Sequence, residues 1–211
     1  MVAKGREDDA RDSPMRRVLR KVRRSLLVVG WCVRGRPAPP PHSVKQRIVT
    51  AYARRFALTT LVESGTYLGD MVAGVRKRFE RIYSIELGED LAARARARFA
   101  GDEAVVVLCG DSGVLLPSLL KEIRKPCLFW LDGHYSGGIT ALGDGVTPIL
   151  SELESILQDA VRGHLILVDD ARLFSGKDGY PHLSEVRELV GRRWPGAPFE
   201  VGDDVMRIGP V

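Results

Sequence analysis

The sequence has few of the residues that form disulfide frameworks or zinc sites. Its 211 residues include three cysteines, four histidines and 7% aromatic residues. Cys32, Cys109 and Cys127 do not have the spacing of metal ligands, and two of them lie in apolar runs. This pattern argues against a disulfide-rich or zinc-binding scaffold and favours reduced thiols in a cytoplasmic protein.

Long apolar runs and the common phosphate-binding motifs are also absent from the sequence. The apolar stretch at 26–33 is too short to span a bilayer, and it follows a charged region that does not resemble a signal peptide. No G-x-G-x-x-G dinucleotide fingerprint is present. The glycine-rich segment 136–148, SGGITALGDGVTP, lacks the Gly-Lys-Ser/Thr ending of a P-loop. We expect it to be a lid, an acceptor-binding loop or an exposed insertion.

The net charge of +5 belongs to the N-terminal region. Of the 32 Lys/Arg and 27 Asp/Glu residues, 11 and 4 respectively lie within residues 1–36, which leaves 21 basic and 23 acidic residues in the remainder. Because the remainder is not basic and shows no interleaved aromatic surface, the composition argues against a nucleic-acid partner.

Residues 1–41 are predicted to form a basic tail in front of a main domain at 42–211. The first twelve residues are polar and have no apolar period, which is typical of disorder. The stretch MRRVLRKVRRSLLVV at 15–29 has the spacing of a basic amphipathic helix. Such a helix either lies on an anionic membrane surface, with Trp31 near the headgroups, or packs on its own domain. The proline-rich run RPAPPPH at 36–42 is expected to be a stiff spacer.

After the spacer, short apolar runs alternate with segments of helical periodicity. Five runs are continuously apolar or rich in β-branched residues, as expected of strands buried on both faces: 58–63, 81–86, 104–109, 126–132 and 164–169. Helical spacing occurs at 71–79, 91–99, 114–123 and 149–157. The alternation predicts an α/β, Rossmann-like fold: an open, mostly parallel sheet with helices on both faces. A later helix is expected at about 183–190, and the closing runs FEV and VMRIG are expected to add edge strands.

Carboxylates stand at the junctions where the predicted strands end. Ligands of an open parallel sheet bind outside the carboxyl ends of its strands. Acids at such junctions also serve as helix N-caps, an alternative that suits Asp111 or Asp170 individually. Acids at five successive junctions favour a binding crevice. They are Glu63, Glu86, Asp111, Asp132, Asp169 and Asp170.

The first junction, VESGTYLGD, has the spacing E-x-G-x-x-x-G. Gly65 and Gly69 stand in a tight turn before a helix, where a residue without a Cβ lets the backbone approach a ligand closely. Glu63 is a poor neighbour for a pyrophosphate and a good one for an amino group or a cation. The turn therefore favours a ligand other than a dinucleotide.

Several segments carry a resemblance, in the same order along the chain, to a known family. VESGTYLG, IYSIELGEDLAARARARFAG, VVLCGDSGVLLPSL, FWLDG and LILVDD are similar to the successive motifs of class I S-adenosylmethionine (SAM)-dependent methyltransferases. Within that family the chain resembles the metal-dependent O-methyltransferases, typified by catechol O-methyltransferase and macrocin O-methyltransferase. The resemblance covers about residues 58–170 and implies the same α/β fold and SAM as cofactor.

The resemblance implies a SAM site in the crevice. The glycine turn would admit the methionine end of SAM, with Glu63 near its amino group. Glu86 would accept hydrogen bonds from the ribose hydroxyls, and Asp111 would meet the amino group of the adenine. The residues expected to contact SAM are Glu63, Gly65, Thr66, Gly69, Glu86, Asp111, Ser112 and Asp132.

The resemblance also implies a divalent cation, most simply Mg²⁺, bound by Asp132, Asp169 and Asp170. Methyl transfer to oxygen is an in-line displacement, so alignment of the acceptor hydroxyl matters. A hard cation held by carboxylates can orient that hydroxyl and lower its pKa. The alternative is that Asp132 caps a helix and Asp169 bonds a loop.

The general base is predicted to be His134. The catechol enzymes place a lysine three residues after the first metal aspartate, and Tyr135 stands at that position here. The imidazole of His134 titrates near neutrality and is the natural substitute. The alternative for His134 is a hydrogen-bonded structural role.

Together these residues predict a methyltransferase that acts on an oxygen of a hydroxylated small molecule, such as a sugar or a secondary metabolite. Two other functions stay open. One is a nucleotide-dependent oxidoreductase, against which the absent dinucleotide fingerprint argues. The other is a non-catalytic module whose tail docks on a membrane or a partner. The sequence identifies neither the acceptor nor the oligomeric state.

Overall fold

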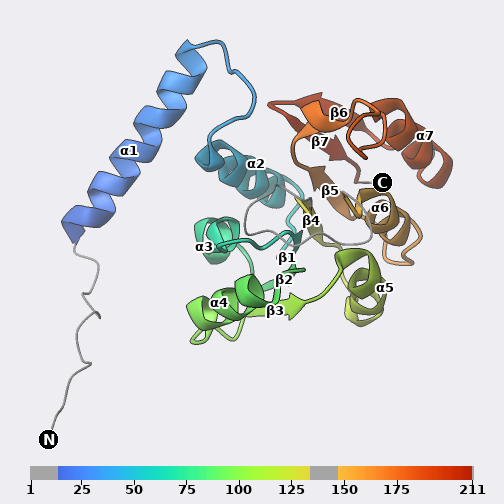
Figure 1. Cartoon of the computed structure of the whole chain (residues 1–211), viewed down its shortest axis with the longest axis horizontal. Helices are drawn as coiled ribbons and strands as arrows, with labels where there is room; N and C mark the ends of the chain where they lie inside the picture. The colour runs from blue at the N-terminus through green and yellow to red at the C-terminus, as the bar shows by residue number, and fades with distance from the viewer. Residues whose placement is uncertain (1–13, 134–146, 211) are drawn as a thin grey trace, which may run out of the picture.

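One sheet of seven strands lies at the centre of the molecule (Figure 1). The computed structural model describes residues 14–133 and 147–210. The strands are β1 (Thr60–Ser64), β2 (Arg81–Glu86), β3 (Val105–Cys109), β4 (Leu128–Leu131), β5 (Leu165–Val168), β6 (Phe199–Gly202) and β7 (Val205–Ile208). Their order in the sheet is β3-β2-β1-β4-β5-β7-β6.

The first five strands are parallel, and β7 runs antiparallel to both β5 and β6. The chain therefore winds outward from β1 in one direction and from β4 in the other. In an open sheet, the place where the winding direction reverses forms a crevice above the strand ends. Here that place lies between β1 and β4, which are hydrogen-bonded neighbours.

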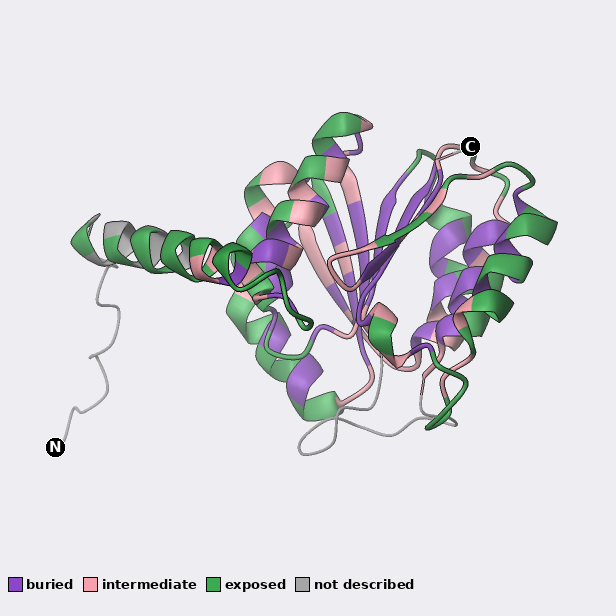
Figure 2. Ribbon diagram, turned by 90° about the horizontal axis from the view of Figure 1, so that it is seen from above, coloured by how far each residue is buried: buried purple, intermediate pink, exposed green. Residues whose placement is uncertain are grey.

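Helices cover both faces of the sheet (Figure 2). Helices α2, α3 and α4 lie on one face, and α5, α6 and α7 lie on the other (Figure 1). The helices are α1 (Pro14–Val33), α2 (His42–Arg55), α3 (Asp70–Val75), α4 (Glu89–Phe99), α5 (Ser112–Glu122), α6 (Ile149–Leu157) and α7 (Leu183–Arg193), with 3-10 turns at Arg76–Arg78 and Ala171–Leu173.

The central strands are buried on both faces, as the apolar runs predicted. All residues of β4, LFWL, and of β5, LILV, are buried, because each strand packs against helices on its two sides. Continuous apolar runs of this kind are characteristic of parallel strands between two helical layers. The predicted α/β fold with a mostly parallel sheet is confirmed.

Two elements differ from the sequence-based expectation. The helix expected at 71–79 ends at Val75 and continues as a 3-10 turn at Arg76–Arg78. Helix α2 was not predicted at all. Its buried residues include a glutamine and an alanine beside two valines, so its apolar period is weak.

The N-terminal amphipathic helix is present as α1. The expectation that Trp31 faces lipid headgroups is wrong, since Trp31 is 3% exposed and its indole nitrogen donates to the Pro37 carbonyl over 2.7 Å. Other apolar side chains of α1 are exposed. Within the described ranges, no helix combines the length and apolar character needed to cross a membrane.

Candidate functional site

The sheet brings the acids that follow β4 and β5 beside the end of β1. The Asp132 amide donates to the Ser64 carbonyl over 3.1 Å, and the Asp169 amide donates to the Leu131 carbonyl over 3.0 Å. Each bond extends the parallel pairing one step beyond the ends of the strands. Asp132 and Asp169 therefore stand at the place where the winding reverses, where an open parallel sheet binds its ligands.

The turn after β1 approaches the end of β4 closely. A Cβ on Gly65 would lie 2.4 Å from the Asp132 carbonyl oxygen, and the φ of Gly65 is +81°. Gly69 also has a positive φ, and a Cβ there would lie 2.8 Å from the Phe99 ring. Both glycines are thus required by the protein's own packing. A role in admitting a ligand stays a prediction.

Glu86 joins the turn that follows β1 to the turn that follows β2. Its two carboxylate oxygens accept hydrogen bonds from the Tyr67 amide, at 2.7 Å, and the Gly88 amide, at 2.9 Å. Because each carboxylate oxygen has two lone pairs, these bonds leave acceptor capacity for a ligand diol. The geometry fits the predicted ribose-binding role.

Glu63 lies deeper than a ligand-contacting residue usually does. It is 1% exposed, and it accepts a short hydrogen bond from the Ser84 hydroxyl. The Ser84 oxygen lies 2.6 Å from the Thr66 hydroxyl oxygen, so Thr66 belongs to the same buried network. Burial raises the pKa of Glu63 to about 8, and the charges of Asp132 and Glu86 act in the same direction. A direct contact of Glu63 with an amino group stays a prediction.

Asp111 caps helix α5, so the alternative considered for it is realised. Its Oδ1 accepts from the Gly113 amide over 2.7 Å. Ser112, the first residue of α5, is 7% exposed. Capping fixes the position of Asp111 at the rim of the crevice and is compatible with a contact to adenine.

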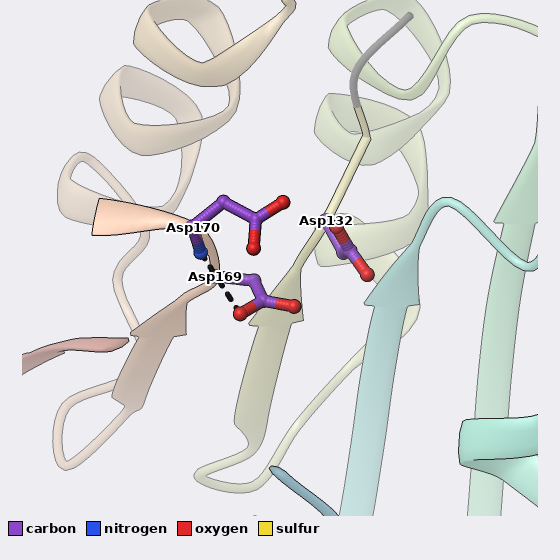
Figure 3. A group of neighbouring side chains, drawn as sticks. All are labelled: Asp132, Asp169 and Asp170. Atoms are coloured by element: carbon purple, nitrogen blue, oxygen red, sulfur yellow. Dashed lines mark hydrogen bonds between the residues drawn. The ribbon is translucent and has the colours of Figure 1, made fainter. Parts of the chain in front are cut away.

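Asp132, Asp169 and Asp170 form one cluster above the ends of β4 and β5 (Figure 3). One carboxylate oxygen from each lies within 4.8 Å of the other two. Asp169 and Asp170 are 3% and 8% exposed. Hard oxygen donors at this separation match what Mg²⁺ or Mn²⁺ prefers, so these residues fit a divalent cation.

Two basic side chains reach this acidic cluster. Lys45 of α2 donates a short hydrogen bond to Asp169 and a second, of 3.2 Å, to Asp170. Arg172 donates to the same Asp170 oxygen over 2.8 Å and also pairs with Asp204. Lys45 was not among the residues predicted from the sequence, because it lies in a helix with a weak apolar period, 87 residues before Asp132.

The two neighbouring aspartates respond differently to this environment. Burial raises the pKa of Asp169 to about 7, with a further contribution from Asp132, although Lys45 opposes the rise. Burial would also raise the pKa of Asp170, but Lys45 and Arg172 together hold it below its usual value. Of these two aspartates, Asp170 is therefore the one whose ionised form the protein stabilises.

Two further side chains lie near enough to the cluster to respond to its charges. Burial raises the pKa of Tyr180 to about 12, with contributions from Asp170 and Asp132. Burial lowers the pKa of His42, at the start of α2, while Asp70 and Asp132 oppose the change. The predicted base, His134, lies outside the described residues, so its assignment stays a prediction.

Glu152 of α6 is a buried carboxyl that the motifs did not indicate. It is 0% exposed, and a Cβ on Gly133 would lie 3.5 Å from its Oε1. Burial raises its pKa to about 7, although the hydroxyls of Ser112 and Ser64 oppose the rise. Glu152 thus lies directly behind the crevice, between the ends of β1 and β4 and the start of α5.

Neither the known family models nor the curated proteins match the sequence. The structure, however, is similar to solved methyltransferases. The O-methyltransferase TomG from Streptomyces achromogenes, involved in tomaymycin synthesis and solved with SAM, aligns over 88% of this chain and 87% of its own, with 16% identity and a TM-score of 0.60.

Two other solved structures agree. An O-methyltransferase from Bacillus cereus, in complex with S-adenosylhomocysteine (SAH), aligns over 88% of this chain and 89% of its own, with 15% identity and a TM-score of 0.58. The SAH-bound methyltransferase PaMTH1 from Podospora anserina aligns over 99% of this chain and 100% of its own, with 17% identity and a TM-score of 0.55. The chain therefore has the class I methyltransferase fold.

The raised pKa of Glu152 predicts how stability depends on pH. Its value in the folded protein, about 7, lies above the ordinary 4.5, so folding favours the protonated carboxyl. This contribution is fully present below about pH 4.5 and is lost as the pH rises through 7. The free energy of unfolding of Glu152→Gln, relative to that of the wild type, should therefore rise by roughly 2–3 kcal/mol between pH 5 and pH 8. Denaturant unfolding of both proteins at the two pH values measures the gain. If the difference in unfolding free energy between the two proteins is the same at pH 5 and pH 8, Glu152 is ionised at both pH values and the prediction is wrong.

Proposed function

We propose that the protein is a SAM-dependent methyltransferase that methylates an oxygen of a hydroxylated small molecule, such as a sugar or a secondary metabolite, with assistance from a divalent cation. The observation that carries the proposal is the shared position of Glu86 and the acidic cluster at the same edge of the sheet, in a methyltransferase fold. SAM-bound and SAH-bound O-methyltransferases with this fold support the assignment.

The cofactor half of the crevice lies over β1, β2 and β3. Glu86 would hold the ribose, since its carboxylate is already oriented by two backbone amides. The turn at Gly65, Thr66 and Gly69 would face the methionine part of SAM, and Asp111 with Ser112 would face the adenine. Fixed groups of this kind lose little freedom when the ligand binds.

The acceptor half lies over β4 and β5. Asp132, Asp169 and Asp170 would hold the cation, which supplies polarisation of the acceptor hydroxyl when it is bound. The aspartates also orient the acceptor relative to the sulfonium methyl, because β4 lies next to β1 in the sheet. His134 is the proposed base, and the free thiols of Cys32, Cys109 and Cys127 support a cytoplasmic location.

Two other functions make different predictions. A nucleotide-dependent oxidoreductase would bind a dinucleotide, and a non-catalytic module would bind SAM without transferring its methyl group. Binding of SAH but not NAD separates the first from the proposal. Transfer of label from SAM to an acceptor separates the second.

Glu86→Gln should weaken SAH binding by roughly 1.5–3 kcal/mol, since a charge-assisted contact to the ribose is lost. Isothermal titration with SAH measures the change. Glu89→Gln, an equal charge change at an exposed position of α4, is the matched control and should bind as the wild type does. Unchanged affinity in a folded Glu86→Gln variant would remove Glu86 from the cofactor site.

Removal of the divalent cation with a chelator should abolish methyl transfer and leave SAH binding intact, because the acidic cluster lies on the acceptor side of the crevice. The assay incubates the protein and radiolabelled SAM with a panel of hydroxylated small molecules, with and without excess chelator. Added Mg²⁺ should restore transfer. Full transfer in excess chelator would contradict the cation's role while leaving the methyltransferase assignment in place.

A further inference from the structure

Lys45 forms a shielded ion pair with the acidic cluster. Its ammonium donates to Asp169 and lies 3.2 Å from Asp170 Oδ1. The side chains of Lys45 and Asp169 are 13% and 0% exposed. Salt screens such a pair weakly, so the ammonium compensates the carboxylates under ordinary conditions.

The backbone that carries Lys45 is held firmly, whereas its side chain is long enough to adopt another position. Gln46, the next residue, is buried and donates to the Asp70 carbonyl over 2.8 Å. A Cβ on Gly74 would lie 2.2 Å from the Gln46 side chain, so α2 and α3 pack closely there. The four-carbon stem of Lys45 is flexible, and its ammonium can leave the carboxylates without movement of α2.

A divalent cation and the Lys45 ammonium require the same oxygen atoms. Mg²⁺ binds carboxylate oxygens at about 2.1 Å, so an ammonium bonded to those oxygens would lie within a few ångströms of the ion. Two cations at that separation repel strongly in a site shielded from water. Simultaneous occupancy is therefore unfavourable.

Of the two basic side chains, Lys45 is the one whose charge is directed at the cluster. Lys45 pairs with Asp169 and Asp170, whereas Arg172 divides its charge between Asp170 and Asp204. Lys45 is therefore the basic group that a divalent cation would displace.

We propose that Lys45 is an internal competitor for the cation site, and that a divalent cation binds by displacing its ammonium from Asp169 and Asp170. The inference rests on the proposed function of the acidic cluster. Lys45 lowers the affinity for the cation and keeps the aspartates compensated whenever the cation is not bound.

Titration of chelator-treated, full-length protein with Mn²⁺, followed by the electron paramagnetic resonance of free Mn²⁺, tests the proposal. Lys45→Met should bind Mn²⁺ roughly tenfold or more tightly than the wild type, since the competing charge is removed. Lys45→Gln, which retains a hydrogen-bond donor without the charge, should also bind more tightly. Lys121→Met, an equal charge change at an exposed position of α5, should bind as the wild type does.

Thermal unfolding provides a second readout. In chelator, Lys45→Met should unfold at a lower temperature than the wild type, and Mn²⁺ should raise its midpoint more. Equal Mn²⁺ affinity in the wild type and both Lys45 variants would overturn the role of Lys45 and leave the cation site in place. If none of the proteins binds Mn²⁺, both the role of Lys45 and the cation site are overturned. The proposed SAM site would still be tested separately by SAH binding.

Helix α1 independently carries an exposed apolar face. Its apolar residues recur at spacings of three and four, which places them on one side of the helix. Each of the following is at least half exposed: Met15, Leu19, Val22, Leu26, Val29 and Val33.

The charge of α1 restricts what can cover that face. Its 20 residues include six Lys/Arg and no Asp/Glu. A second copy of the helix would bring the same positive charge, which opposes self-association at this surface. An anionic lipid surface offers both an apolar layer and negative headgroups. We infer that α1 lies on anionic membranes and holds the catalytic domain at their surface.

Co-sedimentation with vesicles tests this inference. The full-length protein should bind phosphatidylserine-containing vesicles, bind phosphatidylcholine vesicles weakly, and be released by salt. Leu19→Glu/Leu26→Glu should lose binding, whereas Leu150→Glu/Val201→Glu, which alters exposed apolar residues of α6 and β6, should retain it. Equal vesicle binding by the two variants would overturn the inference. A second outcome would also overturn it: the wild type binds no vesicles but self-associates, and Leu19→Glu/Leu26→Glu abolishes this self-association.

Discussion

Carboxylates that are buried together at one edge of a sheet repel one another and lose hydration, so each needs its own means of compensation. Glu86 accepts two backbone amides. Asp169 is paired with Lys45. Burial shifts Glu63 and Glu152 toward their protonated forms. The crevice is thus a place where charge is held in balance before any ligand binds, and a cationic ligand or metal ion would find acceptors already in place.

The sequence was sufficient to predict the fold and the strand ends at which the acids gather. Continuous apolar runs identify strands that are covered on both faces, and the acids that follow them must gather at one edge when the strands are parallel. Asp132 and Asp169 were expected together for this reason, and the structure brings them together. Asp111 shows the limit of the argument, since a cap and a ligand contact give the same sequence pattern.

The basic side chain that pairs with Asp169 was not predictable from the sequence. Lys45 lies in α2, whose buried positions include Gln46 and Ala53, so the helix lacks a strong apolar period. A lysine in such a segment is ordinarily a solvated residue. Its contact with Asp169 depends on the packing of α2 against α3, which is a long-range feature of the fold. Glu152 was missed for a similar reason, because only the tertiary structure places α6 behind the crevice.

The most direct test of the account is the anomalous difference map of crystals grown with SAH and Mn²⁺. We predict SAH along Glu86 and the turn after β1, a Mn²⁺ peak within coordination distance of Asp132, Asp169 and Asp170, and a Lys45 ammonium turned away from the aspartates. A map with no Mn²⁺ peak at the aspartates, with Lys45 still paired to Asp169, would contradict the cation site. SAH bound elsewhere would contradict the assignment of the crevice.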